Sequence, residues 1–345
     1  MKTVYSDAHR LQHGRAELND GQLVPCFERP ERADLILERV RATGLGEVVA
    51  PLDLGRTPLT RVHTENYLSF LEGAWDAWVA EHGSAVDALP LVWPTRGMRQ
   101  CEPENIDGRL SYFSCDASSP ITAGTWRAAT AAAHVALTGQ QLVAEGERAV
   151  FALCRPPGHH AAADYYGGYC FLNNAAIAAQ ACRDQGAARV AILDIDYHHG
   201  NGTQLIFYER ADVLTVSLHA HPRQEFPYFL GYADERGKGA GEGANCNYPL
   251  DWGTDFAIWS PALVDACKVI AVYQADVLVV SLGVDTFKGD PISKFRLESS
   301  DYPKIGARLA RLGLPTLFVM EGGYAVEAIG INAVNVLMGF EDNAV

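Results

Sequence analysis

The sequence predicts an α/β protein with three layers, in which a mostly parallel central sheet carries helices on both faces. Short apolar runs typical of buried strands alternate along the chain with longer helical patterns, and this alternation favours parallel strands joined by helices. The 345 residues are 48% hydrophobic, which suffices for a large core. We therefore expect a single domain over residues 1–345.

Three helices and five strands are predicted from local composition. The helices are expected at 124–144, 173–185 and 303–312, and Gly313 is typical of a helix stop. The strands are expected in apolar, often β-branched runs at 149–154, 189–196, 212–218, 276–282 and 315–321.

The segment 82–122 differs from the rest of the chain. Four prolines interrupt any long helix there, at positions 90, 94, 103 and 120. We interpret this segment as an inserted loop over the edge of the sheet, because structureless loops of this length are commonly functional.

Reactive side chains stand at the carboxyl ends of four predicted strands. In open parallel sheets the ligand site lies beyond these ends, so the side chains are expected to converge there. They are His159, His160, Asp194, Asp196, His198, Asp285 and Tyr324.

Asp196, His198 and Asp285 form the candidate metal site. Alternation along a strand puts Asp194, Asp196 and His198 on one side, and two carboxylates with one imidazole leave positions open for water and substrate. Zn²⁺ suits such ligands, although Fe²⁺ and Co²⁺ remain alternatives. The plainer interpretation is that Asp285 caps a helix and Gly200-Asn201-Gly202 is a turn.

The remaining side chains fit hydrolysis at a metal site. His159 and His160 offer imidazoles for proton transfer, and the hydroxyl of Tyr324 could donate to a developing oxyanion. Individually they could equally be turn residues or a packing aromatic. The chain has no Gly-x-Ser-x-Gly motif and no phosphate-binding loop, so serine-hydrolase and nucleotide chemistry are disfavoured.

The composition limits which binding partners are expected. With 28 Lys+Arg against 42 Asp+Glu the formal charge is −14, which argues against nucleic acid and is compatible with a cationic substrate. The eight cysteines include no Cys-x-x-Cys pair and are expected to be reduced. We find no leader peptide and no membrane-spanning run, and expect a cytoplasmic protein without a membrane partner.

Several motifs resemble those of the histone deacetylase superfamily, most closely its branch of bacterial acetylpolyamine amidohydrolases. The residues that carry the resemblance are Pro30-Glu31-Arg32, Val62-His63, the runs 154–160, 167–174 and 194–203, and Glu321-Gly322-Gly323-Tyr324. The resemblance spans nearly the whole chain. It implies an arginase-like fold, a deacetylase-like catalytic domain, and metal-dependent hydrolysis of an acetyl amide to acetate and a free amine.

The resemblance also implies roles for individual residues. Asp196, His198 and Asp285 would bind one Zn²⁺ per subunit, His160 would be the general base and acid, and Tyr324 would polarise the acetyl carbonyl. His159 would be the electrostatic partner, oriented by Asp194. Asn201 stands behind His160 where some relatives have Asp, so a less basic His160 is expected. Substrate contacts would come from Gly168, Tyr169, Phe226 and Asp107.

Further expectations concern ions and partners. The resemblance implies structural K⁺ ions, one near Asp194, Asp196, His198, Ser217 and Leu218, and another near Phe207, Arg210 and Val213. It also implies a homodimer shaped by the 82–122 insert, and acetylated polyamines or diamines such as N-acetylputrescine and N-acetylcadaverine as substrates. Ser118 stands where an acidic residue of the insert is expected, which leaves the preferred amine length open.

Three alternatives differ from this function. The same chemistry could act on acetyl-lysine in proteins, since the fold does not fix the substrate. A binding protein without turnover is disfavoured by the complete catalytic set. An arginase-like ureohydrolase would need ligands for a second metal ion.

Overall fold

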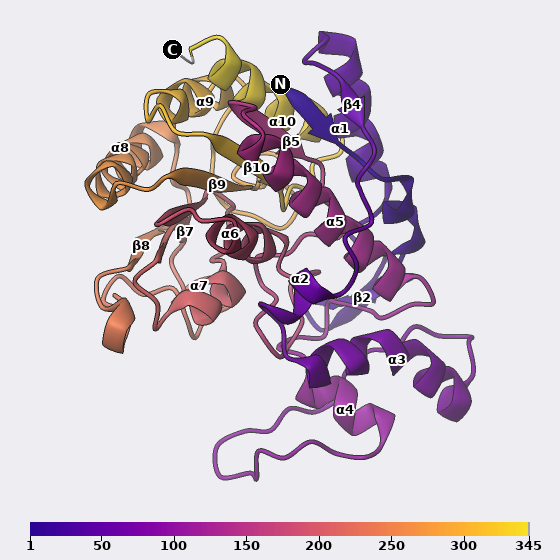
Figure 1. Ribbon diagram of the computed structural model, residues 1–345. Helices are drawn as coiled ribbons and strands as arrows, with labels where there is room; N and C mark the ends of the chain where they lie inside the picture. The colour runs from indigo at the N-terminus through magenta and orange to yellow at the C-terminus, as the bar shows by residue number, and fades with distance from the viewer. Residues whose placement is uncertain (344–345) are drawn as a thin grey trace.

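A parallel sheet of eight strands forms the centre of the protein in the computed structural model, which describes residues 1–343. The strand order is β4-β1-β5-β10-β9-β6-β7-β8, and every neighbouring pair is parallel (Figure 1). The strands are β1 (Lys2–Val4), β4 (Val48–Val49), β5 (Ala149–Ala152), β6 (Val190–Asp194), β7 (Val213–Ala220), β8 (Asn245–Leu250), β9 (Val277–Leu282) and β10 (Thr316–Met320). A separate antiparallel hairpin joins β2 (Glu17–Asn19) to β3 (Gln22–Val24).

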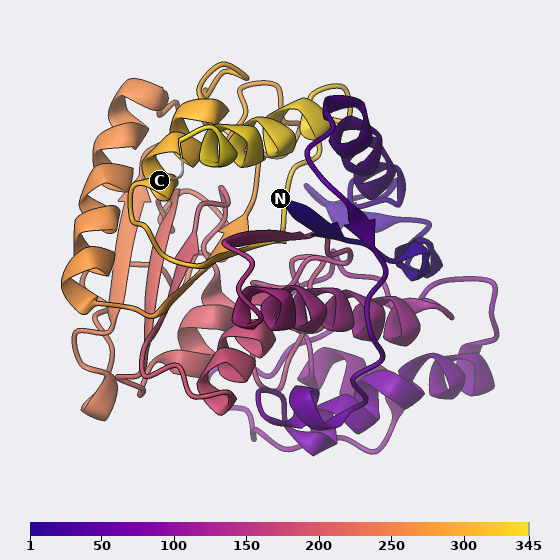
Figure 2. The ribbon, with the colours of Figure 1, turned by 45° about the horizontal axis from the view of Figure 1, so that its top comes forward.

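Helices cover both faces of this sheet, as Figure 2 shows. The α-helices are α1 (Glu31–Thr43), α2 (Thr57–Thr60), α3 (Glu65–His82), α4 (Ile106–Tyr112), α5 (Thr125–Ala144), α6 (Asn174–Asp184), α7 (Asn201–Phe207), α8 (Phe256–Tyr273), α9 (Tyr302–Ala310) and α10 (Ile329–Glu341). The described residues also form two 3₁₀ helices, η1 (Asp7–Leu11) and η2 (Gly239–Gly241).

The alternation of strand side chains divides the core into two halves. On β5, Val150 and Ala152 pack with α3, α5 and α6, whereas Ala149 and Phe151 pack with α1, α8, α9 and α10. Residues on β6 alternate in the same way. Both faces of each central strand are therefore apolar, which is why these strands appear as uninterrupted apolar runs. The predicted three-layer architecture is confirmed.

The predicted elements match the structure, with shifts at their ends. β6 ends at Asp194 rather than continuing to residue 196, so Asp196 and His198 lie in the turn that follows it. The strand-alternation argument for these two residues was therefore wrong. The edge strands β4 and β8 and the adjacent β1 were not predicted, because β1 and β4 are very short and β8 contains Asn245, Asn247 and Pro249.

The segment 82–122 is not entirely a loop. It contains α4, whose N-terminal cap is Asn105, and Ala88 forms an isolated bridge with Ile121. The buried side chains of Ile106 and Leu110 attach α4 to the body of the protein, next to α3. The loop that precedes α4 extends away from the sheet, at the bottom of Figure 1, whereas the residues after α4 return to the body of the protein.

Helix α8 is the one helix within residues 1–343 that is long and apolar enough to span a membrane. In the structure its buried stripe, which includes Trp259, Leu263 and Ile270, packs on the sheet, and Asp265 and Lys268 pair on its exposed side. This pattern is that of an amphipathic surface helix. The eight cysteines are free thiols.

Candidate active site

Four neighbouring strands carry the candidate site. β5, β10, β9 and β6 are consecutive in the sheet, so the segments that follow them meet at one edge. These segments contain all seven reactive side chains predicted to converge. The structure brings them together because parallel strands place their carboxyl ends on the same side.

Asp196, His198 and Asp285 form a group suited to hold a metal ion. One ligand atom from each lies within 4.8 Å of the others, and both aspartates have no exposed surface. His198 Nδ1 lies 3.2 Å from Asp285 Oδ2 and 3.5 Å from Asp196 Oδ1. Three atoms of types that Zn²⁺ prefers thus point at a common position.

The backbone holds both carboxylates in place. The second oxygen of Asp285 accepts a hydrogen bond from the Tyr197 N–H at 2.8 Å, and Asp196 Oδ2 accepts one from the Gly322 N–H at 2.8 Å. A Cβ on Gly322 would lie 2.6 Å from an oxygen of each aspartate. Glycine is therefore required there, because any side chain would displace both ligands.

The electrostatics of this group favour a bound cation. Burial and the nearby Asp196 carboxylate raise the pKa of Asp285 to about 8. The pKa of His198 is also raised, because hydrogen bonds to Asp196 and Asp285 outweigh burial. Two buried carboxylates at this separation repel each other unless a positive charge lies between them. The residues therefore fit a divalent metal ion.

The two histidines have different partners. His159 Nδ1 lies 2.9 Å from Asp194 Oδ2, and His160 Nδ1 lies 2.6 Å from Asn201 Oδ1. Asn201 also donates to the Tyr165 hydroxyl at 3.0 Å, which orients its amide. Each imidazole thus has its Nδ1 held by a partner, but only His160 lines the cavity, whereas His159 Nε2 lies 3.9 Å from Asp196 Oδ1.

The pKa values of His159 and His160 differ because their surroundings differ. Although burial opposes it, the carboxylates of Asp194 and Asp196 raise the pKa of His159 to about 10. Burial and the neighbouring His159 and His198 lower the pKa of His160 well below its usual value. At neutral pH His159 is an imidazolium and His160 is a neutral base, which is the arrangement that acid–base chemistry needs.

The Gly168-Tyr169 turn lies against His160 in the left-handed region, with φ of 53° and 67°. A Cβ on Gly168 would lie 2.2 Å from His160 Cδ2, so no larger residue fits. Asp116 accepts from the Gly168 N–H at 2.6 Å, and Ser119 accepts from the Tyr169 N–H at 2.8 Å. These two bonds stabilise a conformation that costs free energy for a non-glycine residue.

Tyr324 is fixed through its backbone. Asp290 Oδ2 accepts from the Tyr324 N–H at 2.7 Å, and the Arg32 guanidinium lies 4.7 Å from the centre of the Tyr324 ring. The Tyr324 and Tyr169 rings meet edge to face at 5.5 Å. Burial raises the pKa of Tyr324 well above its usual value, so its hydroxyl stays a proton donor.

A cavity of about 600 Å³ leads to these residues. His160, His198, Gly168, Tyr169, Phe226 and Tyr324 are among the residues that line it. Four carboxylates also line it, those of Glu17, Asp20, Asp116 and Glu225, against one ammonium group, that of Lys294, and we call these four carboxylates the acidic wall. The lining is therefore suited to a slim cationic molecule with one end at the histidines.

Three of the four predicted substrate contacts, Gly168, Tyr169 and Phe226, line the cavity. The Phe226 ring also meets the His160 ring, 4.9 Å away and perpendicular to it. Asp107 does not line this cavity. Its carboxylate lies at the start of α4, 2.9 Å from His82 Nε2, because helix α4 directs it to the outer surface.

The residues expected to bind K⁺ lie close to the site. Asp194 and Ser217 are register partners on β6 and β7, so the residues expected around the first K⁺ ion are neighbours. Phe207 and Val213 lie at the end of α7 and the start of β7, on either side of Arg210. Potassium at both positions stays a prediction.

Sequence reasoning missed Glu17, Asp290 and the contact role of Glu321. Glu17 belongs to a short hairpin whose only signal is the Asn19-Asp20-Gly21 turn, and Asp290 stands in an irregular Gly-Asp-Pro turn. Glu321 belongs to the Glu321-Gly322-Gly323-Tyr324 motif, but the motif predicts no role for its side chain. A buried carboxylate at the end of a predicted strand is the signal that could have identified it.

Comparisons with known proteins agree with this site. Residues 26–339 match the model of the histone deacetylase domain family. The chain is 66% identical over 341 residues to acetylpolyamine amidohydrolase 2 of Pseudomonas aeruginosa, covering 99% of both chains. It is 62% identical to acetylpolyamine amidohydrolase 1 of the same organism, covering 100% of both. The crystal structure of an acetylpolyamine aminohydrolase from Burkholderia pseudomallei superposes with a TM-score of 0.95 at 38% identity, covering 100% of both chains.

Metal binding should stabilise the protein through Asp285. After chelator treatment, Zn²⁺ at about 100 times its Kd should add about 2.7 kcal/mol of stability to the wild type. Asp285→Asn should abolish most of this gain, yet be more stable than the wild type without metal, because burial and the Asp196 carboxylate oppose ionisation of Asp285 and this cost is absent for asparagine. Thermal melts with and without Zn²⁺, together with metal analysis, measure both effects. The exposed Asp76→Asn variant is the control, and an equal response to Zn²⁺ in all three proteins would contradict the assignment.

Proposed function

The chain belongs to the histone deacetylase family, and from this premise we propose that it hydrolyses acetylated polyamines or diamines in a zinc-dependent reaction. One observation carries the proposal. A single cavity is lined by His198 of the Asp196-His198-Asp285 group, by His160 and by Tyr324, and the acidic wall lines the same cavity. The names of the most similar relatives support the same substrate class.

The residues present account for each proton transfer. A zinc ion held by Asp196, His198 and Asp285 would supply Lewis acidity toward the acetyl carbonyl and the attacking water. Neutral His160 takes a proton from water, and the proton is later delivered to the nitrogen of the leaving amine as the C–N bond breaks. Imidazolium His159 stabilises the negative charge that develops, and the Tyr324 hydroxyl donates a hydrogen bond to the carbonyl oxygen.

The amine end of the substrate would lie toward the acidic wall. Glu17 is buried beside the cavity, and it accepts hydrogen bonds from the Tyr169 hydroxyl at 2.7 Å and the Phe27 N–H at 3.1 Å. The aromatic rings of Phe27, Tyr228 and Trp252 lie along the same wall. Aromatic faces next to carboxylates favour protonated amines on flexible apolar chains.

The insert offers a surface for a second copy of the chain. Leu91 is 82% exposed and Val92 58% exposed, and their N–H groups both donate to the Ser111 hydroxyl on α4. Exposed apolar side chains that are adjacent on a fixed segment are typical of a contact between subunits. We propose a homodimer that buries them.

The substrate class is tested by comparing catalytic efficiencies. Wild-type enzyme loaded with Zn²⁺ should turn over N-acetylputrescine and N-acetylcadaverine with kcat/KM at least ~10-fold above that for acetyl-lysine peptides, because the acidic wall suits a small cation. Tyr324→Phe, which lacks the hydroxyl donor, should lose ~100-fold or more in kcat. A preference for peptides would instead favour a protein deacetylase.

The pH dependence of substrate selection depends on Glu17. Burial raises the pKa of Glu17 to about 7, so its negative charge is present above this pH and lost as the pH falls through it. The ratio of kcat/KM for N-acetylputrescine to that for neutral N-butylacetamide should therefore fall roughly three- to tenfold from pH 8 to pH 6. The ratio cancels changes in the histidines, which affect both substrates alike.

Glu17→Gln should make this ratio independent of pH at its low-pH value. The exposed Glu81→Gln variant should behave as the wild type. A ratio that still falls with pH in Glu17→Gln would assign the effect to another group.

The proposed dimer is tested by sedimentation velocity. The wild type should sediment as a dimer at micromolar concentration, and Leu91→Asp with Val92→Asp should shift it to a monomer, because the contact would bury two charges. Val272→Asp changes an equally exposed apolar residue on α8 and should leave the dimer intact. A monomeric wild type would rule the contact out.

A further inference from the structure

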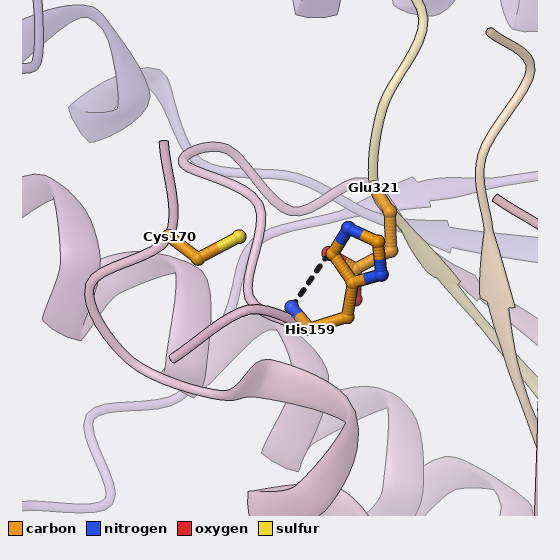
Figure 3. A group of neighbouring side chains, drawn as sticks. All are labelled: His159, Cys170 and Glu321. Carbon is orange, nitrogen blue, oxygen red and sulfur yellow. Dashed lines mark hydrogen bonds between the residues drawn. The ribbon is translucent and has the colours of Figure 1, made fainter. Parts of the chain in front are cut away.

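The carboxylate of Glu321 lies beneath the turn that carries both histidines. Its Oε2 accepts hydrogen bonds from the Gly158 N–H at 2.6 Å and the His159 N–H at 3.1 Å. Figure 3 shows the second of these bonds as a dashed line, with Cys170 on the other side of the turn. Glu321 follows β10 and the turn follows β5, so one side chain connects two neighbouring strand ends.

Glu321 is itself rigidly held. Its N–H donates to the Leu282 carbonyl at the end of β9, at 3.0 Å, and its own carbonyl accepts from the Arg32 guanidinium at 2.6 Å. The residue has no exposed surface. A carboxylate that accepts backbone N–H bonds forms roughly twice as strong a hydrogen bond as a neutral acceptor does, so this contact fixes the turn well.

The turn has little freedom on its other side. A Cβ on Gly158 would lie 2.5 Å from the Asn174 backbone nitrogen, at the start of α6. The turn is therefore enclosed between the backbone of α6 and the Glu321 carboxylate. A shift of this backbone would move both imidazoles, and displacements of about 1 Å are enough to slow catalysis ~100-fold.

We propose that Glu321 is a positioning residue for deacetylation, whose carboxylate fixes the Gly158-His159 backbone and thereby the two imidazoles. The proposal rests on the proposed function, because it concerns the same site. Glu321 contacts no reacting atom. His159, Cys170 and Glu321 also lie close enough together to be grouped as possible metal ligands, but the interactions present are the contact of His159 Nδ1 with Asp194 and the two backbone bonds to Glu321 Oε2. Hydrogen bonding accounts for the arrangement.

The turn depends on one oxygen of Glu321. Both backbone bonds go to Oε2, whereas Oε1 is buried and has no hydrogen-bond partner among residues 1–343. Glutamine keeps an oxygen that can accept these two bonds, and alanine removes it.

The test compares Glu321→Ala and Glu321→Gln with the wild type. Glu321→Ala should lower kcat ~10- to 100-fold with KM within ~3-fold and metal content unchanged, because the ligands are untouched. Glu321→Gln should lose less than ~10-fold in kcat, since the backbone acceptor remains.

Asp301→Ala provides the matched control. Asp301 is also a buried carboxylate that accepts a backbone N–H, that of Glu298 at 2.9 Å, but it lies at the start of α9 away from the cavity. This variant should lose thermal stability without a change in kcat. If Glu321→Ala behaves in the same way, Glu321 is only a structural residue.

A measurement without substrate separates this proposal from the function itself. The proton between His159 Nδ1 and Asp194 should give a downfield NMR signal, assigned with ¹⁵N-labelled histidine. Glu321→Ala should shift or broaden it, and Asp301→Ala should not. An unchanged signal in Glu321→Ala overturns the positioning role, whereas a wild type that hydrolyses no acetyl amide overturns the proposed function alone.

Discussion

The repulsion between the Asp196 and Asp285 carboxylates constrains the whole site. Both are fully buried, and backbone N–H groups aim them at the same position as His198 Nδ1. Removing two like charges from water costs several kcal/mol unless a cation or hydrogen bonds compensate. Gly322 permits this close approach, and the parallel sheet supplies the rigid ends from which the two aspartates extend.

The histidine pair shows how adjacent residues acquire opposite roles. His159 and His160 share a backbone turn, but the first faces the Asp194 carboxylate and the second the neutral amide of Asn201. The pKa values therefore diverge, with His159 raised and His160 lowered. A charged group and a neutral base thus lie side by side, with ring centres 3.9 Å apart, without either needing a bound substrate to set its state.

Much of this arrangement could be predicted from local sequence, for a physical reason. Strands buried on both faces, such as β6 and β9, are apolar throughout, and reactive residues after such strands must meet at one edge. Features that depend on tertiary contacts were missed. Helix α4 is stabilised by a cap at Asn105 and by burial of Ile106 and Leu110, and Asp107 faces His82 because α4 forms. Glu17 reaches the cavity only through the placement of its hairpin, which no local pattern encodes.

The tight contact between Gly168 and the His160 ring limits how this enzyme could be redesigned. Since even a methyl group would collide with the ring at 2.2 Å, the inner end of the channel cannot be widened or narrowed by substitution at that point. Engineering toward bulkier acyl donors or longer amines must act on outer residues such as Tyr228 and Trp252, which are about half exposed and tolerate new shapes. Substitutions at these outer residues leave the catalytic side chains unchanged. New substrate selectivity can therefore be introduced at the entrance of the cavity.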